Sequence, residues 1–250
     1  MNYSLIIPVY NEASVINGTL RELTSAFGKI CHGKTWEIIV VDNASTDRTS
    51  QIVEAFGDEH VSLIRLSAKG KGNAVREGFT HAKGEIVGFT DADLSIPAEQ
   101  VVQTFNQIDS QNENILIGSR FHPKSIMPGR EWWRIGSSQL FNSYARLMLS
   151  VPFRDTQCPL KVVDQEGRAL MLATHERTWF FDLEFLTLAH RAGFRVREVP
   201  ITWNEHYYPE RKSKLSTTRD GLRYLLALPR IKQRLPKQLS LWNEKNNNTV

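Results

Sequence analysis

Two aspartates one residue apart, Asp91 and Asp93, come directly after the strand-forming run "EIVGFT" (85–90). Like charges this close repel each other, and neither aspartate has a basic neighbour in the sequence. Hard carboxylate oxygens, with no thiol or clustered imidazole nearby, suit Mg²⁺ or Mn²⁺ bridging a diphosphate. The alternative is that the two side chains cap a helix that begins at Pro97. The pattern therefore predicts either a cation site or a helix start.

A glycine- and lysine-rich stretch, "KGKGN" (69–73), precedes the aspartates. Flexible backbone amides, the ammonium group of Lys71 and a helix N-terminus could together approach an anion. Taken alone, such a stretch is equally typical of a solvated turn. Next to Asp91 and Asp93, it favours a site for a phosphate-containing ligand.

Short apolar runs alternate with helical patterns over the first half of the chain. The apolar runs predict strands buried on both faces, and the segments between them are long enough for crossover helices. We expect strands at 3–9, 36–41, 61–66, 85–90 and 114–119, and helices at 14–27, 47–56, 72–81 and 97–108. This order predicts an α/β fold with a mainly parallel sheet flanked by helices. Ligands of such sheets bind beyond the carboxyl ends of the strands, where this chain has "YNE", "DNAST", "SAKGKGN" and "DADLS".

The regular alternation fades after residue 119. We expect helices at 131–149 and 181–192 and a strand around "VREVPITW". The predicted organisation is one catalytic domain (1–215), a basic amphipathic helical extension (216–240) and a disordered tail (241–250).

Composition narrows the class of protein. The chain has 250 residues, of which 41% are hydrophobic and 23% charged, as expected of a globular domain. No apolar run reaches the length of a membrane span, and no basic segment precedes the first apolar stretch, so we expect neither a span nor a secretion signal. The isolated Cys31 and Cys158 predict no disulfide and no zinc site. We expect a cytoplasmic location.

Two further classes are disfavoured by sequence patterns. The glycines match neither the dinucleotide fingerprint nor the P-loop. Residues 211–237 hold nine Lys or Arg and one acid, which leaves 22 basic and 26 acidic residues elsewhere. Because the body of the chain is net acidic, we expect no nucleic-acid partner.

Four motifs, in order and spacing, resemble the nucleotide-sugar domain of the inverting family 2 glycosyltransferases, which have the GT-A fold. They are "IIPVYNE", "VVDNASTD", "KGKGNAVREG" and "TDADLS". Further motifs, "GSR", "RDTQCPLK", "FDLEFL" and "SKL", resemble the dolichyl-phosphate and polyprenyl-phosphate sugar synthases. The "RDTQC" form is most similar to the β-glucosyltransferase branch, and the resemblance covers about residues 3–230.

The resemblance implies a donor side and a metal. Asp93 would bind Mg²⁺ or Mn²⁺ and take part in catalysis, and Asp91 would face the nucleotide beside the metal. Mannosyl relatives often have glutamine where this chain has Ser95, which leaves the third protein ligand unassigned. The other donor-side residues implied are Pro8, Tyr10, Glu12, Asp42 and Lys71.

The resemblance also implies an acceptor side, because cations recognise phosphate oxygens. Arg120 and Lys214 would be catalytic. A glycine usual before the latter motif is replaced in "ERKSK", which puts the conformation of that loop in question. The other substrate-binding cations implied are Arg130, Arg154 and Lys161.

The implied reaction is a single in-line displacement at the anomeric carbon by a phosphate oxygen of a lipid phosphate. Phosphate is already ionised at neutral pH, so positioning and leaving-group stabilisation matter more than a strong base. Asp182 and Glu184 stand two residues apart on a predicted helix, and structural roles are favoured for them over catalysis.

The basic C-terminal helix has two interpretations. It could lie on an anionic membrane surface, on the cytoplasmic face, and bring the site to a lipid substrate. It could equally pack on the catalytic core with a solvated charged face. The expected activity is transfer of glucose from UDP-glucose to a polyprenyl or dolichyl phosphate. The alternatives are a GDP-mannose-dependent mannosyltransferase, a transferase with a soluble acceptor, and a nucleotide-sugar-binding protein without turnover.

Overall fold

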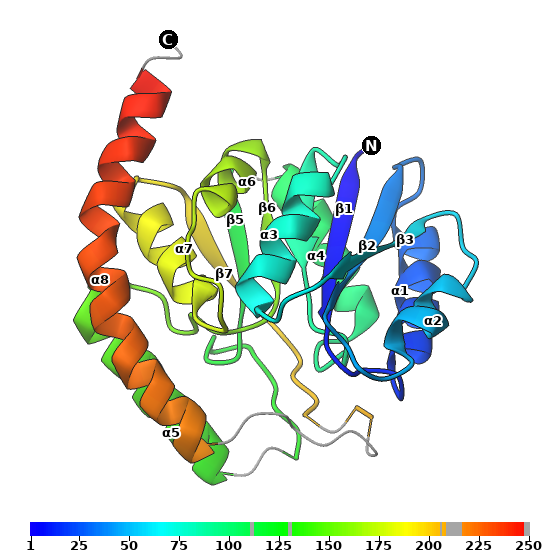
Figure 1. Ribbon diagram of the computed structural model, residues 1–250, viewed down its shortest axis with the longest axis horizontal. Coiled ribbons are helices and arrows are strands. Elements are labelled where there is room, and N and C mark those ends of the chain that lie inside the picture. The colour runs from blue at the N-terminus through cyan, green and yellow to red at the C-terminus, as the bar shows by residue number, and fades with distance from the viewer. Residues whose placement is uncertain (111–112, 130–131, 206, 209–216, 248–250) are drawn as a thin grey trace.

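The computed structural model describes residues 1–110, 113–129, 132–205, 207–208 and 217–247. Within these residues the centre is a seven-stranded sheet with the order β3-β2-β1-β4-β6-β5-β7 (Figure 1). The strands are β1 (Tyr3–Val9), β2 (Trp36–Asn43), β3 (Val61–Leu66), β4 (Ile86–Phe89), β5 (Ile115–Ser119), β6 (Lys161–Val163) and β7 (Val196–Pro200). The first four are parallel neighbours, so their carboxyl ends share one edge. The predicted mainly parallel α/β sheet is confirmed.

Helices cover both faces of this sheet. They are α1 (Ile16–Ile30), α2 (Thr49–Glu54), α3 (Lys71–His81), α4 (Ala98–Ser110), α5 (Trp132–Leu149), α6 (Gln165–Leu172), α7 (Phe181–Arg191) and α8 (Thr217–Asn247). The hydrophobic cluster on one face includes side chains of α1 and α4, and the cluster on the other includes α3, α6 and α7. The latter three helices lie in front of the sheet in Figure 1.

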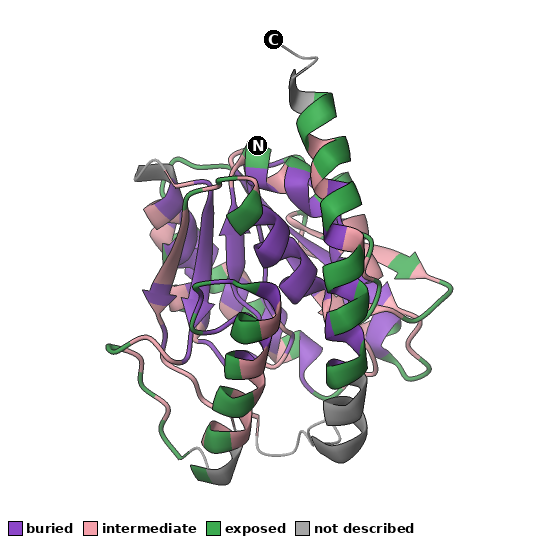
Figure 2. Ribbon diagram, turned by 90° about the vertical axis from the view of Figure 1, so that its left-hand side faces the viewer, coloured by how far each residue is buried: buried purple, intermediate pink, exposed green. Residues whose placement is uncertain are grey.

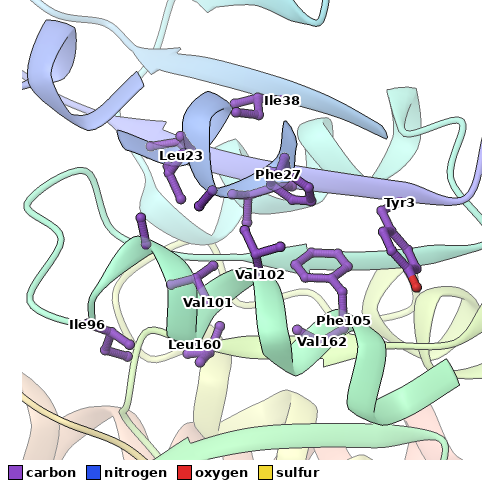
Figure 3. Packing of buried hydrophobic residues seen from close by; sticks show 14 of the residues in the cluster. Tyr3, Leu23, Phe27, Ile38, Ile96, Val101, Val102, Phe105, Leu160 and Val162 are labelled. Atoms are coloured by element: carbon purple, nitrogen blue, oxygen red, sulfur yellow. The ribbon is translucent and has the colours of Figure 1, made fainter. Parts of the chain in front are cut away.

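The alternation of strand side chains divides the core between these faces. Leu5 and Ile7 of β1 belong to the cluster under α1 and α4, whereas Ile6 between them belongs to the opposite cluster. In the first cluster Phe105 contacts both Tyr3 and Phe27, with ring centroids 5.4 and 5.7 Å apart (Figure 3). Both faces of the central strands are thus buried. The polar residues that follow these strands lie at the carboxyl edge of the sheet.

Two elements were not predicted from the sequence. β6 has only three residues and pairs antiparallel with both β4 and β5, so no periodicity marks it. The short α6 follows it, with Asp164 as N-cap accepting a hydrogen bond from the Gly167 backbone N–H at 2.8 Å. The cap residue was the available signal for this helix.

The C-terminal helix packs on the core and is longer than expected. α8 contacts α7 and α5, and it buries Tyr224, Leu228, Ile231 and Leu235. It continues through Asn247, so residues 241–247 are helical where the sequence indicated a disordered tail. Figure 2 shows a long exposed face along the same helix. Of the two interpretations of this helix, packing on the core is present, and its outer face remains exposed.

Candidate active site at the strand ends

The loops after β1 and β2 are joined by side chain to backbone hydrogen bonds. The Asn11 side chain accepts from the Thr46 backbone N–H at 2.7 Å, and the Glu12 backbone N–H donates to the Thr49 hydroxyl at 2.9 Å. Pro8 and Tyr10 are half-buried beside them, and Glu12 is buried. The structure therefore brings three predicted donor-side residues to one corner.

Asp42 organises the loop that follows β2. Its carboxylate is buried and accepts hydrogen bonds from the Ser45 backbone N–H at 2.8 Å and from the Ser50 hydroxyl. A carboxylate can accept further hydrogen bonds at its remaining lone pairs. Asp42 is thus fixed in position at the strand end where the resemblance implies nucleoside contact.

Strained backbone conformations concentrate at this edge. Asn11, Ala44 and Leu94 have φ values of 53°, 61° and 46°, and they follow β1, β2 and β4 respectively. L-residues rarely adopt this left-handed region, and such residues cluster at functional sites. The three loops are therefore held in specific shapes by the surrounding structure.

The chain supplies a positive partner for the paired aspartates. The Lys71 ammonium, at the start of α3, lies 2.6 Å from Asp91 Oδ1, and the Lys71 side chain is only 10% exposed. Asp91 has no basic neighbour in the sequence, and the fold supplies one, because the N-terminus of α3 lies beside the turn that follows β4. The lysine motif and the aspartate motif form one charged group.

Asp93 lies in the same turn. Its Oδ1 accepts from the Ser95 backbone N–H at 3.2 Å, within the turn that precedes α4, and the residue is half-buried. Among the described residues, no group of three or more histidine, cysteine or acidic side chains could hold a metal. Two hard carboxylates fit Mg²⁺ or Mn²⁺, which commonly take one or two carboxylates and complete their shell with water and substrate phosphates.

The turn before α3 is anchored on both sides. The Lys69 ammonium contacts the Tyr10 hydroxyl and lies 4.2 Å from the centre of its ring, and the Gly70 backbone N–H donates to Asn43 Oδ1 at 2.7 Å. These contacts connect the β3 end to the β1 and β2 ends. The "KGKGN" stretch is therefore an ordered part of the site.

Residues 174–180, between α6 and α7, complete this side of the site and were not predicted. The Gly72 backbone N–H donates to the carbonyl oxygens of Arg177 and Thr178 at 3.0 and 3.2 Å. Trp179 is 46% exposed, and the Lys71 ammonium lies 4.8 Å from the centre of its ring. A Cβ at Gly72 would stand 2.4 Å from the Glu176 carbonyl oxygen, so only glycine permits this approach. The paired glycines were the signal of a close backbone neighbour.

Arg120 is paired with a protein carboxylate. Its Nε and Nη2 atoms lie 2.7 and 2.8 Å from the two oxygens of the fully buried Asp155. Burial alone would raise the pKa of Asp155, but the charge and hydrogen bonds of Arg120 hold it below its ordinary value. This geometry does not support the expected catalytic role of Arg120 toward phosphate, since the bidentate face already binds Asp155.

The expectation that Lys161 binds substrate is wrong. Its side chain is fully buried, donates to the Cys158 carbonyl oxygen at 2.6 Å and forms an ion pair with Asp182 at 2.9 Å. Burial raises the pKa of Asp182, and Lys161 offsets this only in part. Lys161 is therefore an interior counter-ion for α7.

The remaining predicted cations divide into one described residue and two others. Arg154 is exposed and lines a hollow of about 430 Å³, and its backbone N–H donates to Glu198 at 3.0 Å. Arg130 and Lys214 lie outside the described residues.

The arrangement matches solved structures of one fold. Glucosyl-3-phosphoglycerate synthase from Mycobacterium tuberculosis, in complex with Mn²⁺, UDP and glucosyl-3-phosphoglycerate, superposes with a TM-score of 0.66 at 18% identity, over 91% of this chain and 79% of that one. Mannosyl-3-phosphoglycerate synthase from Rubrobacter xylanophilus gives 0.69 at 16% identity, over 95% and 74%. The protein has the GT-A fold of nucleotide-sugar-dependent glycosyltransferases.

Sequence comparisons identify the family. Residues 4–166 match the model of glycosyl transferase family 2, and the chain belongs to that family. It is 29% identical over 223 residues to glycosyltransferase AglD of Haloferax volcanii, covering 88% of this chain and 35% of that protein. It is 32% identical over 218 residues to the dolichyl-phosphate beta-glucosyltransferase ALG5A of Trichomonas vaginalis, covering 81% and 65%. The corresponding Saccharomyces cerevisiae enzyme is 31% identical over 226 residues, covering 81% and 66%.

The chain thus spans about a third of the length of AglD and just under two thirds of that of ALG5A. The family and the fold expected from the four motifs are confirmed. Among the described residues, no helix combines the length and apolar character needed to cross a bilayer.

Proposed function

We propose that the protein is an inverting glycosyltransferase that moves glucose from UDP-glucose to a polyprenyl or dolichyl phosphate. The observation that carries this is the charged group of Lys71, Asp91 and Asp93 at the shared edge of four parallel strands, in a chain of glycosyl transferase family 2. The similarity to relatives named dolichyl-phosphate beta-glucosyltransferase supports the choice of sugar and acceptor.

On the donor side, the corner of Pro8, Tyr10, Glu12 and Asp42 would hold the nucleoside. Asp91 and Asp93 would hold Mg²⁺ or Mn²⁺, which when bound would neutralise negative charge on the diphosphate leaving group. The Lys71 ammonium, already within this group, would bind a diphosphate oxygen. Positioning of the diphosphate is therefore shared between β4 and the turn before α3.

The nucleophile would be an ionised phosphate oxygen, so no strong general base is required. The contacts of α7 are consistent with a reaction that needs no general base, because both acidic residues of this helix already have structural partners. Asp182 pairs with Lys161, and the fully buried Glu184 accepts from the backbone N–H groups of His175 and Glu176 at 2.7 and 2.6 Å.

The acceptor phosphate has a candidate location in the hollow of about 430 Å³ beside α5. Arg146 and Arg154 both line it, together with amide and hydroxyl groups of Gln139, Asn142 and Ser143. Guanidinium groups with neighbouring neutral donors suit a phosphate monoester. We therefore assign Arg154 to acceptor binding, with Arg146 as a partner that sequence reasoning missed.

The lipid chain would reach this hollow from a membrane surface contacted by the α5/α8 pair, the two helices α5 and α8. These helices are in contact, and the Tyr224 hydroxyl of α8 donates to the Phe141 carbonyl oxygen of α5 at 2.9 Å. Both carry large exposed apolar side chains, namely Trp132, Leu140, Leu147, Leu225 and Leu226. α8 adds exposed cations, namely Arg230, Lys232 and Lys237. Apolar side chains beside cations suit the cytoplasmic face of an anionic membrane.

Thermal unfolding with Mg²⁺ or Mn²⁺ and UDP, GDP, UDP-glucose or GDP-mannose tests the donor, since ligand bound to the native state raises the midpoint. We expect the uridine ligands to raise the unfolding midpoint in the presence of metal, and we expect this increase to be lost in Asp93→Asn. An assay of the wild type should then show transfer of glucose from UDP-glucose to polyprenyl phosphate. An increase with the guanosine ligands alone would assign the mannosyl alternative. No increase with any ligand would contradict the function proposed.

A further inference from the structure

The C-terminal helix holds the segment 174–180 by two polar side chains. Arg234 Nη2 of α8 lies 2.8 Å from Glu176 Oε2 and 3.7 Å from Glu184 Oε1. One turn further along the helix, the Gln238 side chain donates to Glu184 Oε1 at 3.0 Å and contacts His175 Nδ1. Charged and polar groups of α8 thus meet one end of the segment.

This contact is more protected from solvent than a typical surface ion pair. The Glu176 side chain is 14% exposed and that of Arg234 39%. Burial would raise the pKa of Glu176, but hydrogen bonds from Thr178 and Arg234 hold it below its ordinary value. From α3, Arg76 donates to the Thr174 carbonyl oxygen at 2.8 Å, so the segment is held from two helices.

The other end of the segment forms one wall of the donor site. Its carbonyl oxygens accept from the Gly72 backbone N–H, and its Trp179 ring lies against the Lys71 ammonium, which pairs with Asp91. A continuous chain of contacts therefore connects α8 with the paired carboxylates. It runs from the Arg234–Glu176 ion pair through the backbone hydrogen bonds of Gly72 to the Lys71–Asp91 ion pair. A shift of the segment would move Lys71 and the glycine turn together.

We propose that Arg234 is a positioning residue for donor binding. By holding Glu176, it fixes segment 174–180 against the glycine turn and sets the place of Lys71. This rests on the proposed function, and it connects the helix assigned to the membrane surface with the site assigned to the nucleotide diphosphate.

The test compares Arg234→Gln with Arg230→Gln, which removes the same charge from an exposed position of the same helix. The first measurement is hydrogen exchange of the Gly72, His175 and Glu176 amides in the full ligand-free chain. The second is the affinity for UDP with Mn²⁺ by calorimetry. We expect faster exchange at these amides and about fivefold weaker UDP binding in Arg234→Gln alone, equivalent to ~1 kcal/mol. Arg234→Lys keeps a positive charge near Glu176, so it should restore part of the amide protection and part of the UDP affinity.

The outcomes distinguish a failure of the role proposed for Arg234 from a failure of the proposed function. Unchanged exchange in Arg234→Gln would overturn the contact as a restraint on the segment. Faster exchange with unchanged UDP affinity would overturn the positioning role. If the wild-type protein bound neither UDP nor GDP with Mn²⁺, the proposed function would fail and the donor role of Arg234 with it. The exchange data would still decide the restraint.

Discussion

The Lys71 ammonium offsets part of the negative charge of the proposed donor site when no cation is bound. It lies 2.6 Å from Asp91 and is largely shielded from solvent. A divalent cation that binds Asp91 must therefore compete with an ammonium group already present. A diphosphate that arrives with the cation relieves this competition, because it offers Lys71 new oxygens. Metal and nucleotide are thus expected to bind cooperatively.

Replacing Lys71 with glutamine should separate these effects. We expect the affinity for Mn²⁺ alone to rise about fivefold, since removal of a partly buried competing charge is worth ~1 kcal/mol. The affinity for UDP in the presence of Mn²⁺ should fall. Calorimetric titration of each ligand measures both changes, with Lys83→Gln, an exposed lysine outside the site, as the control. Unchanged or weaker Mn²⁺ binding would show that Lys71 does not compete with the cation.

Asp155 and Arg120 make stability depend on pH. Asp155→Asn leaves the buried guanidinium without its counter-charge, and the free energy of unfolding at pH 7 should fall by about 3–5 kcal/mol. The folded-state pKa of Asp155 is lowered, so its stabilising effect is complete above the unfolded value of about 3.9 and is lost as pH falls through the folded value.

The difference between wild type and Asp155→Asn should therefore shrink on acidification below about pH 4. Urea unfolding at a series of pH values measures it, with the exposed Glu59→Gln as a charge-matched control. A difference that stays constant down to low pH would mean that Asp155 is not the titrating group.

Residue types at the site could be predicted, but their partners could not. Asp91, Asp93 and the glycine and lysine stretch stand out because strand-end loops must be polar and turn-forming. Lys71 and Asp91 are far apart in sequence, and their contact depends on the order of β3 and β4 in the sheet. Lys161 was misassigned because a motif lysine looks the same whether it faces substrate or a buried Asp182.

At the scale of elements, length and periodicity decided what could be predicted. The buried strands and crossover helices of the first half follow from long apolar runs and repeated turn signals. β6 has three residues and takes its place from pairing with β4 and β5 on either side. Such a strand is specified by tertiary contacts, and a single sequence carries almost no local signal for it.

The contact between α3 and segment 174–180 can be tested with Gly72→Ala. The added Cβ would meet the Glu176 carbonyl oxygen at 2.4 Å, so the segment must move. We expect a loss of about 1–3 kcal/mol in the free energy of unfolding, as for overpacked sites, together with weaker UDP binding.

Gly28→Ala is the matched control, because it adds the same methyl group at an exposed position of α1 where nothing lies within 4 Å. That change should stabilise the protein by about 0.5–1 kcal/mol, as expected for glycine replaced inside a helix. Equal stability of the two variants, measured by urea unfolding, would contradict the close approach at Gly72.

At the scale of the whole molecule, charge and apolar surface are unevenly distributed. The acidic body carries the strand-end site, whereas exposed leucines lie on both helices of the α5/α8 pair and exposed cations are added by α8. Figure 2 shows long exposed stretches along this pair. The side chains of Leu140 and Leu147 on α5 are 69% and 79% exposed to solvent, so they do not contribute to the packing of α5 on the core. A surface of this kind costs solubility unless it is covered by a partner, and a lipid surface matches both its charge and its apolar character.

Substitution of Leu140 and Leu147 by glutamine should release the protein from lipid. We expect the wild type to sediment with phosphatidylcholine vesicles containing about a third phosphatidylserine, less strongly as salt rises. The double variant should bind at least about a hundredfold more weakly, because two buried leucines at roughly 1.5–3 kcal/mol each together contribute about 3 kcal/mol or more. Leu172→Gln, an exposed leucine on α6, should leave binding unchanged. If the double variant and Leu172→Gln lost vesicle binding equally, the binding would be general apolar adsorption. If neither variant lost vesicle binding, α5 would be excluded from the membrane contact.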